Sequence, residues 1–232
     1  MKKKDYSIVI PAYNEERRIE GTLWKYSNYF SDSEIIVILN GCVDGTEEIV
    51  SKIAKKQKQI SYVVFPEGLG KGGAILEGFK IAKRKYIGFT DADLAVEPED
   101  LESLFELLTE KNQAVIGSRR LPDSKVPVKQ PLARIVSSLA FNLFVRTVFY
   151  LNIRDTQCPA KVFSRKAIED ILSEIRTKGF EFDVELLWRL RKKGHSILEA
   201  PVTWRHTKFS TFRLFFAHKM AISLLKIRFG IN

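Results

Sequence analysis

Two aspartates separated by one residue follow a short apolar segment. The stretch "YIGFTDADL", residues 86–94, contains Asp91 and Asp93. Carboxylates this close repel each other unless a cation or solvent lies between them. Mg²⁺ and Mn²⁺ prefer oxygen ligands, and Mg²⁺ commonly binds one or two carboxylates together with substrate phosphates. Turn residues that begin the next helix are the alternative explanation. The position directly after an apolar, strand-forming segment favours a metal site.

A glycine-rich segment offers a second kind of chemistry. The stretch "GLGKGGAILEGF", residues 68–79, places four glycines around Lys71 before a predicted helix. Glycines let the backbone approach a phosphate, a helix N-terminus favours negative charge, and an ammonium group adds a point charge. The spacing does not match the phosphate-binding loop of nucleotide triphosphatases. We therefore predict a phosphate near Lys71, with a tight turn as the alternative reason for the glycines.

Strands and helices alternate through the first half of the chain. Strands are predicted over residues 6–13, 34–40, 60–66, 85–91 and 113–118, and a helix follows each of the first four, with Asn14 as the N-cap of the first helix. This alternation is typical of an α/β fold with a mostly parallel sheet. Ligands of such sheets bind at the carboxyl ends of the strands. Asn40, Asp91 and Arg119 all lie at such ends.

The second half contains two helices with unusually little polar surface. A polar turn is predicted over 152–163, between a helix that begins near Leu132 and a C-terminal helix over 212–229. Each of the two helices carries one narrow polar stripe: Arg134, Ser138, Asn142 and Arg146 on the first, and Lys219, Ser223 and Lys226 on the second. Basic, apolar helices of this kind lie in the headgroup plane of a membrane. The alternative for the first helix is the solvated face of a core helix, and the alternative for the C-terminal helix is docking on the core or on a second subunit. Neither helix has the uninterrupted apolar length of a spanning segment.

Composition limits the class of protein. The chain has 232 residues, 45% of them hydrophobic, which is enough for one sizeable core. Its 38 Lys and Arg against 28 Asp and Glu give a formal charge of +10, which favours anionic partners such as nucleic acid, a phosphorylated substrate or a membrane surface. No nucleic-acid-binding motif is present, so a nucleic-acid-binding module is a remote alternative. Cys42 and Cys158 have neither metal nor disulfide spacing, as expected of a reduced cytosolic protein without a signal peptide.

The order of these motifs resembles a known enzyme family. "IVIPAYNEE", "GCVDGT", "GKGGAILEGF", "DADL" and "IGSR" are similar to family 2 glycosyltransferases of the GT-A fold. Within that family the chain resembles the polyprenyl-phosphate sugar synthases, which include the dolichyl-phosphate mannose synthases. The stretches "IRDTQCPAKVFSRKA", "FDVELLWR" and "APVTWRH" are most similar to the second half of the dolichyl-phosphate glucosyltransferases. The resemblance implies a single GT-A catalytic domain over 1–232, a Rossmann-like three-layer sandwich with added interfacial helices. Its nucleotide-sugar-binding half would reach about residue 120 and its acceptor-binding half about 121–210, followed by an amphipathic helix over about 211–232.

The resemblance also implies a role for each matching residue. The nucleotide sugar would contact Pro11, Tyr13, Glu15, Asn40, Lys71, Asp91 and Ala92. Asp91 and Asp93 would bind Mg²⁺ or Mn²⁺ as the cofactor. The catalytic residues would be Asp93, Arg119 and Arg134, and the lipid phosphate would be held by Arg119, Arg134 and Ser138.

Three positions depart from the family pattern. Leu39 and Asn40 replace paired aspartates, which leaves UDP or GDP open. Ala95 stands where some members have a glutamine near the metal. Residues 207–211 replace a glycine-serine-lysine turn, so contacts of Arg205 or Lys208 with the diphosphate stay open.

The reaction implied is the inverting transfer of a hexose, glucose or mannose, from UDP or GDP to a polyprenyl or dolichyl phosphate. A phosphate monoester is largely ionised near neutral pH, so orientation and fixed positive charge matter more than a strong base. The partners expected are the nucleotide sugar, the lipid phosphate and the cytoplasmic face of the membrane, with no nucleic acid; a homo-oligomer stays open. The alternative within the family is a polysaccharide, protein or other hydroxyl acceptor, which would need a base such as Glu97 or Glu99.

Overall fold

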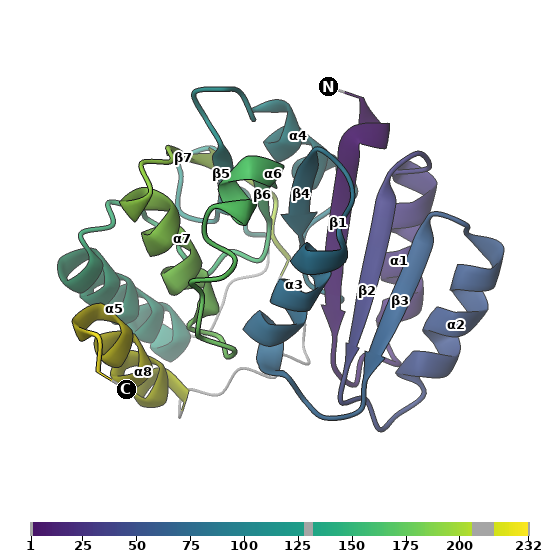
Figure 1. Ribbon diagram of the computed structural model, residues 1–232, viewed down its shortest axis with the longest axis horizontal. Helices are drawn as coiled ribbons and strands as arrows, with labels where there is room; N and C mark the ends of the chain where they lie inside the picture. The colour runs from purple at the N-terminus through teal and green to yellow at the C-terminus, as the bar shows by residue number, and fades with distance from the viewer. Residues whose placement is uncertain (1, 128–131, 206–215, 232) are drawn as a thin grey trace.

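A seven-stranded sheet forms the centre of the protein (Figure 1). The computed structural model describes residues 2–127, 132–205 and 216–231, without the side chains of 132–134, 136 and 216–218. In spatial order the strands are β3 (Ile60–Phe65), β2 (Glu34–Asn40), β1 (Tyr6–Ala12), β4 (Tyr86–Phe89), β6 (Lys161–Ser164), β5 (Ala114–Ser118) and β7 (Ile197–Pro201). All neighbouring strands pair in parallel except β6, which is antiparallel to both β4 and β5. The predicted mostly parallel sheet is confirmed.

Helices cover both faces of this sheet. The residues of β1 and β2 are almost all buried, as expected for parallel strands that lie between two helical layers. One layer contains α1 (Ile19–Tyr29), α2 (Thr46–Lys56) and α4 (Pro98–Glu106), and the other contains α3 (Gly70–Ile81), α6 (Arg165–Glu169) and α7 (Phe182–Lys192). A short 3₁₀ helix, η1 (Lys3–Asp5), precedes β1. The predicted three-layer sandwich is therefore confirmed.

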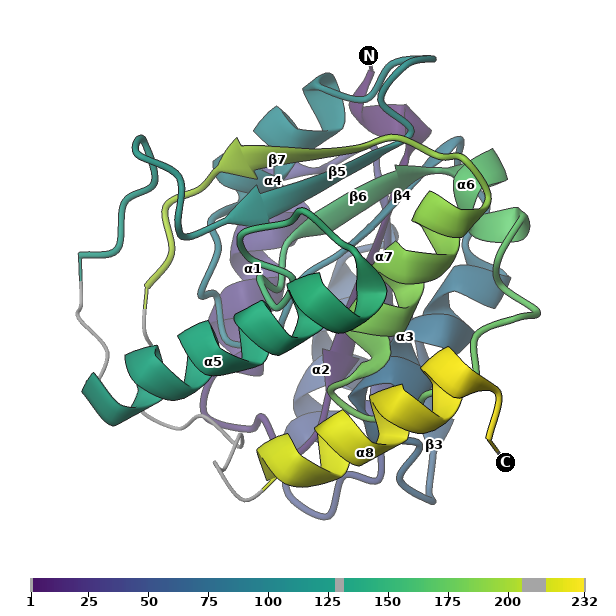
Figure 2. The same cartoon turned by 90° about the vertical axis from the view of Figure 1, so that its left-hand side faces the viewer.

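Two further helices lie outside these layers. Helices α5 (Leu132–Phe149) and α8 (Phe216–Phe229) run side by side on the outer side of α7 (Figures 1 and 2). They share a separate apolar cluster with α7 in which Val145, Phe149 and Leu224 are buried. The C-terminal helix therefore docks on the body of the protein through one face.

The turn predicted over 152–163 is wrong at its end, because β6 begins at Lys161. The lysine in the short sequence "AKVF" interrupts the run of apolar residues, so the hydrophobic pattern alone does not predict this strand. Its side chain is fully buried, and Nζ donates to Asp183 Oδ1 at 2.5 Å and to the carbonyl of Cys158 at 2.6 Å. A buried ammonium group is tolerated when it is paired and hydrogen-bonded in this way.

Candidate active site

The candidate site lies where the order of strands reverses. Strand β1 has β2 on one side and β4 on the other, and ligands of open α/β sheets bind at the carboxyl ends of strands at such a point. Tyr13 and Glu15 follow β1, Asn40 ends β2, and Asp91 and Asp93 follow β4. Residues that are far apart in the sequence, and were predicted to bind the nucleotide sugar, thus reach one edge of the sheet. Pro11 lies inside β1, opposite Ile38 of β2.

Helix α1 fixes the loop that carries the two aspartates. Thr22 Oγ1 donates to the carbonyl of Ala92 at 2.8 Å, and the Tyr26 hydroxyl donates to the carbonyl of Val96 at 3.0 Å. Inside the loop, the amide of Ala95 donates to Asp93 Oδ1 at 3.1 Å. The buried residues Ala92 and Ala95 anchor the loop, while the carboxylates of Asp91 and Asp93 stay partly accessible. The position of both carboxylates is therefore set by the scaffold.

Each aspartate has a cation of the chain beside it. Lys71 Nζ lies 2.6 Å from Asp91 Oδ1, and Arg18 Nη1 lies 3.8 Å from Asp93 Oδ2. Burial lowers the pKa of Lys71, but the negative charges of Asp91 and Asp183 outweigh burial, so the net shift is upward. Lys71 is therefore positively charged at neutral pH. Its contact with a phosphate stays a prediction, and the structure brings its ammonium group to the edge that carries Asp91.

Glu15 adds a third carboxylate to the same edge. Its Oε1 accepts a 2.7 Å hydrogen bond from Arg18, and its backbone amide donates to Thr46 Oγ1 at 2.7 Å. Its Oε2 is buried without a well-oriented hydrogen bond, although Arg18 Nη2 lies 2.6 Å away. Burial raises the pKa of Glu15 to about 7; Arg18 opposes the shift, while Asp93 and Asp91 add to it. Glu15 is thus a carboxyl group that changes charge near neutral pH.

The donor set fits a hard divalent cation that is shared with a substrate. Within the described residues, no group of three or more His, Cys, Asp or Glu side chains has the arrangement of a metal site. Asp91 and Asp93 supply two partly accessible carboxylates, and the Oε2 atom of Glu15 is buried beside Arg18 at the same edge. Mg²⁺ bound by one or two carboxylates fills its remaining positions with water and substrate phosphate. The residues present therefore suit an ion that binds together with a diphosphate.

The glycines beside Lys71 have a packing role. The amides of Gly72 and Gly73 donate to the carbonyls of Gly179 and Lys178, at 3.2 and 3.1 Å. A Cβ atom on Gly72 would lie 2.3 Å from Cβ of Phe182, so only glycine lets α3 approach this segment. These two amides are already used, so they are not available to an anion, whereas the Lys71 side chain adds a positive charge to this turn.

Arg119, at the end of β5, is held by a buried carboxylate. Its Nε and Nη2 donate to Asp155 at 2.7 and 2.8 Å, and its backbone amide donates to Asp155 at 3.0 Å. Burial would raise the pKa of Asp155, but Arg119 lowers it to about 2. Glu199 fixes the loop by accepting from the amides of Arg154 and Asp155. The pair uses one N–H of Nε and one of Nη2, which leaves the N–H groups of Nη1 and the second N–H of Nη2 for the predicted contact of Arg119 with a lipid phosphate.

Arg120 is a functional candidate that the sequence analysis missed. Its Nη2 donates to Ser138 Oγ at 2.7 Å, and its Nη1 donates to the carbonyl of Arg154 at 2.8 Å. Ser138 is thus brought to the end of β5, as its predicted role requires. Arg134 lies in the first turn of α5, one helical turn before Ser138, and its side chain is outside the described residues. The second arginine of "GSRR", directly after a strand, was the signal available.

Three described side chains of the polar stripe on α5, Ser138, Asn142 and Arg146, form hydrogen bonds with residues outside the helix. Asn142 is buried and donates to the carbonyl of Ile153 at 3.2 Å, and Arg146 donates to Asn152 Oδ1 at 2.9 Å. The opposite surface is apolar and open to solvent, with Leu139 53% and Leu143 64% exposed. Among the described residues, no helix combines the length and the apolar character needed to pass through a bilayer. Helix α5 therefore buries Val145 and Phe149 together with the polar Asn142, and it also leaves part of its apolar surface exposed.

Comparison with known proteins agrees with this geometry. The model of the family described as "Glycosyl transferase family 2" matches residues 7–172, which include both aspartates and Arg119. The chain belongs to glycosyl transferase family 2. The seven-stranded sheet with helices on both faces agrees with this membership.

Two curated relatives and one solved structure illustrate the similarity. Glycosyltransferase AglD from Haloferax volcanii is 35% identical over 207 residues, which cover 86% of this chain and 33% of that protein. The dolichyl-phosphate beta-glucosyltransferase of Saccharomyces cerevisiae is 33% identical over 245 residues, covering 96% and 73%. Glucosyl-3-phosphoglycerate synthase from Mycobacterium tuberculosis, in complex with Mn²⁺, UDP and phosphoglyceric acid, shares the fold with a TM-score of 0.74 at 21% identity, covering 98% and 79%.

The remaining predicted residues of this family 2 enzyme differ in how far they are buried. Tyr13 is exposed at the site edge, whereas Asn40 is buried and its Oδ1 accepts from the amide of Leu69 at 2.6 Å. Asn40 thus joins β2 to the glycine-rich segment. Lys208 lies outside the described residues. Cys158 is buried, which raises its pKa to about 12, and is no nucleophile.

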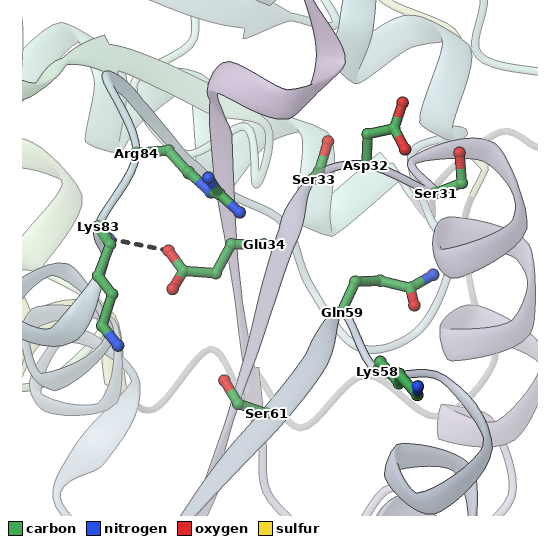
Figure 3. A pocket seen from close by; sticks show the side chains of 9 residues that line it. All are labelled: Ser31, Asp32, Ser33, Glu34, Lys58, Gln59, Ser61, Lys83 and Arg84. Atoms are coloured by element: carbon green, nitrogen blue, oxygen red, sulfur yellow. Dashed lines mark hydrogen bonds between the residues drawn. The ribbon is translucent and has the colours of Figure 1, made fainter.

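A separate pocket of about 430 Å³ lies at the opposite edge of the sheet (Figure 3). Its lining precedes or begins β2, β3 and β4, at the amino ends of these strands. Glu34 in its wall accepts from Ser7 Oγ at 2.5 Å and from the amide of Lys83 at 2.8 Å. These contacts join the ends of strands, and ligands of this fold class bind at the other edge. The pocket therefore takes no part in the candidate site.

Proposed function

We propose that the protein transfers a hexose, with inversion, from a nucleotide sugar to a polyprenyl phosphate such as dolichyl phosphate. The supporting observation is that one edge of the sheet carries two charge clusters. Asp91, Asp93 and Lys71 suit a metal and a diphosphate, whereas Arg119 and Arg120 suit a second phosphate. The similarity to the yeast dolichyl-phosphate beta-glucosyltransferase supports a polyprenyl phosphate as acceptor and glucose as the first sugar to test.

Residues up to about 120 would form the donor half. Asp91 and Asp93 would hold Mg²⁺ or Mn²⁺, which when bound neutralises charge that develops on a departing nucleoside diphosphate. Lys71 would contact the diphosphate, and Tyr13, Glu15 and the neighbouring strand ends would contact the nucleotide. Thr22 and Tyr26 keep the aspartate loop in place through their bonds to Ala92 and Val96. Preorganised positive and negative groups of this kind reduce the reorganisation needed for transfer.

Residues of about 121–210, with the C-terminal helix of about 211–232, would serve the acceptor. Its ionised phosphate needs fixed positive charge rather than a strong base. Arg119 is held in orientation by Asp155, and Arg120 holds Ser138 on α5. The outward apolar surface of α5, and Ile222 and Phe229 on α8, would meet the acyl region of a membrane surface. The predicted cytoplasmic face is compatible with the two free cysteines.

The alternative acceptor, a sugar or protein hydroxyl, would need a general base. Glu97 is engaged by two cations: Lys25 Nζ lies 2.5 Å from Oε2, and Arg205 Nη1 lies 3.4 Å from Oε1. Glu99 is exposed in the first turn of α4. Neither carboxylate is arranged to accept a proton at the strand edge, which favours an acceptor that is already ionised.

A transfer assay tests the proposal. The donors are UDP-glucose, UDP-N-acetylglucosamine and GDP-mannose, each with a short polyprenyl phosphate, with Mg²⁺ or Mn²⁺ and again with chelator. We expect one donor to give a β-linked lipid product only when metal and lipid phosphate are both present. The matching polyprenol without phosphate serves as the control acceptor. Donor hydrolysis without transfer to the lipid phosphate would contradict the proposed acceptor.

A further inference from the structure

Lys71 binds directly to one of the proposed metal ligands. Its Nζ lies 2.6 Å from Asp91 Oδ1, and its side chain is 19% exposed. A divalent cation on Asp91 would lie a few ångströms from this ammonium group, and like charges at that distance in a partly buried site repel strongly. The contact and the metal therefore compete for the same carboxylate.

The carboxylates around Lys71 stabilise its positive charge, and its flexible side chain lets the ammonium group change partners. Behind it, the Asp183 carboxylate is tied to the buried ammonium group of Lys161 at 2.5 Å. Lysine carries a compact charge on a flexible four-carbon stem, so the ammonium group can turn without movement of the backbone. The backbone of Lys71 is meanwhile fixed, because the adjoining Gly72 and Gly73 amides bond to the 178–179 segment. The side chain is the movable part of a rigid turn.

Arg18 beside Asp93 differs in this respect. Its Nη2 is held by Glu15 at 2.7 Å, and its Nη1 lies 3.8 Å from Asp93 Oδ2. Arg18 therefore stays with Glu15 when the partner of Asp93 changes. Lys71 has the shorter contact with its aspartate, so its movement dominates any exchange of cations at this site.

We propose that Lys71 is a built-in counter-cation that passes from Asp91 to the diphosphate when a divalent cation binds. This inference rests on the proposed function only in taking a nucleoside diphosphate as the second ligand. Metal alone would leave the Lys71 ammonium without its partner, and nucleotide alone would draw the ammonium away from Asp91. When both ligands are bound, Asp91 pairs with the metal and Lys71 pairs with the diphosphate. Metal and nucleoside diphosphate must then strengthen each other's binding, and by linkage they do so by the same factor.

Manganese binding, measured by the electron paramagnetic resonance signal of free Mn²⁺, tests this exchange without any turnover. Wild type and Lys71→Met are titrated with Mn²⁺ alone, and again with UDP or GDP present. We expect Lys71→Met to bind Mn²⁺ alone about tenfold more tightly than wild type. The strengthening of Mn²⁺ binding by the nucleotide should be about tenfold smaller in the variant, within the usual range of coupling between two ligands.

Matched variants keep the result interpretable. Lys80→Met removes a lysine from the same helix, where it pairs with exposed Glu77 at 2.7 Å, and should behave as wild type. Lys71→Gln should reproduce Lys71→Met, and Asp91→Asn should abolish the Mn²⁺ signal change. Circular dichroism melts confirm that each variant is folded.

Two outcomes would overturn the exchange. One is an unchanged Mn²⁺ affinity in Lys71→Met. The other is Mn²⁺ binding that tightens by the same factor with and without nucleotide, which would mean that Lys71 acts only as a distant charge. If the proposed acceptor alone is wrong, transfer to polyprenyl phosphate fails while the linkage between Mn²⁺ and nucleotide is still observed.

Discussion

Two groups of charged side chains lie at the same edge of the sheet, and they are built differently. We call Arg119, Arg120 and Asp155 the acceptor cluster, and Lys71, Asp91, Asp93, Arg18 and Glu15 the donor cluster, after their proposed roles. In the acceptor cluster, Asp155 is 2% exposed and receives three hydrogen bonds from Arg119, two from the guanidinium group and one from the backbone. In the donor cluster, Asp91 has one contact with a flexible lysine, and Asp93 lies 3.8 Å from an arginine that is bound elsewhere. The first cluster is fixed and the second can change partners.

The difference follows from the chemistry of the residues. A bidentate arginine–carboxylate pair is directional, and a buried one is costly to break, so it holds its geometry. A lysine makes a point contact that can be redirected. A fixed arginine suits an anion that must lie in one place beside the anomeric carbon. A movable cation suits a site where a metal and a diphosphate arrive and leave in each cycle.

The largest effect is expected from Asp91→Asn in the donor cluster. Loss of a charged group that holds the metal should lower transfer by roughly 10²- to 10³-fold, in line with the removal of other electrostatic contacts to a transition state. The melting temperature should hardly change, because the Asp91 side chain is partly solvated. The transfer assay and a thermal melt measure both, with Asp32→Asn at the opposite edge as control. Full activity in the presence of chelator would refute the metal role.

In the acceptor cluster, Asp155→Asn should act first on stability. Removing one partner of a buried pair leaves an uncompensated charge and costs about 3–5 kcal/mol. Urea unfolding measures the free energy. The exposed Glu48, paired with Lys52 on α2, provides a control in Glu48→Gln, whose stability should stay close to that of wild type. Equal losses in both variants would show that Asp155 is not the fixed anchor described above.

Arg120→Met separates phosphate binding from donor binding. We expect the KM for polyprenyl phosphate to rise about tenfold, because one charge-assisted contact is lost, while the Kd for the nucleotide stays the same. Arg84→Met, at the amino edge of the sheet (Figure 3), removes the same charge away from the site. A similar loss of nucleotide affinity in Arg120→Met would argue against an acceptor role.

Much of the fold could be predicted because its signals are local. The buried strands β1 and β2 are continuous apolar runs, and Asp91 and Asp93 follow directly after β4. Asn14 shows where local rules fail. It was predicted to cap a helix, but its φ is 53°, its Oδ1 accepts from the amide of Val43, and α1 begins only at Ile19. A contact with a distant loop overrides the capping preference.

The surroundings of the candidate site depended on tertiary contacts that no pattern in the sequence reveals. The stripe on α5 was recognised, but its partners, Arg120 and the 152–153 segment, come from other elements. The same applies to Lys161, whose burial depends on Asp183 in α7. Hydrophobic periodicity reports that a face differs from its neighbours, and only packing decides which face meets the protein.

The smallest expected effect concerns Glu15. The charge of this carboxyl group should change with pH near neutrality, whereas the charge of Asp155 should stay constant there. Its pKa of about 7 lies above the ordinary value of 4.5, whereas Asp155 titrates near 2. Between pH 4.5 and 7 the folded protein keeps a proton on Glu15 that the unfolded chain releases, so this contribution is present below pH 4.5 and is lost as pH rises through 7. Glu15→Gln lacks it. The stability of wild type should therefore fall relative to that of Glu15→Gln as pH rises from 5 to 8.

The slope of that difference is the informative quantity, because Glu15→Gln also weakens the contact with Arg18 by an amount that does not depend on pH. Urea unfolding of both proteins in chelator at several pH values measures it. Parallel curves would mean that Glu15 is ionised throughout this range and belongs with the fixed charges of the acceptor cluster. A wild-type curve that falls relative to the Glu15→Gln curve as pH rises would place a titrating carboxyl group beside the movable cation. A donor cluster with adjustable charge and an acceptor cluster with constant charge would then share one sheet edge.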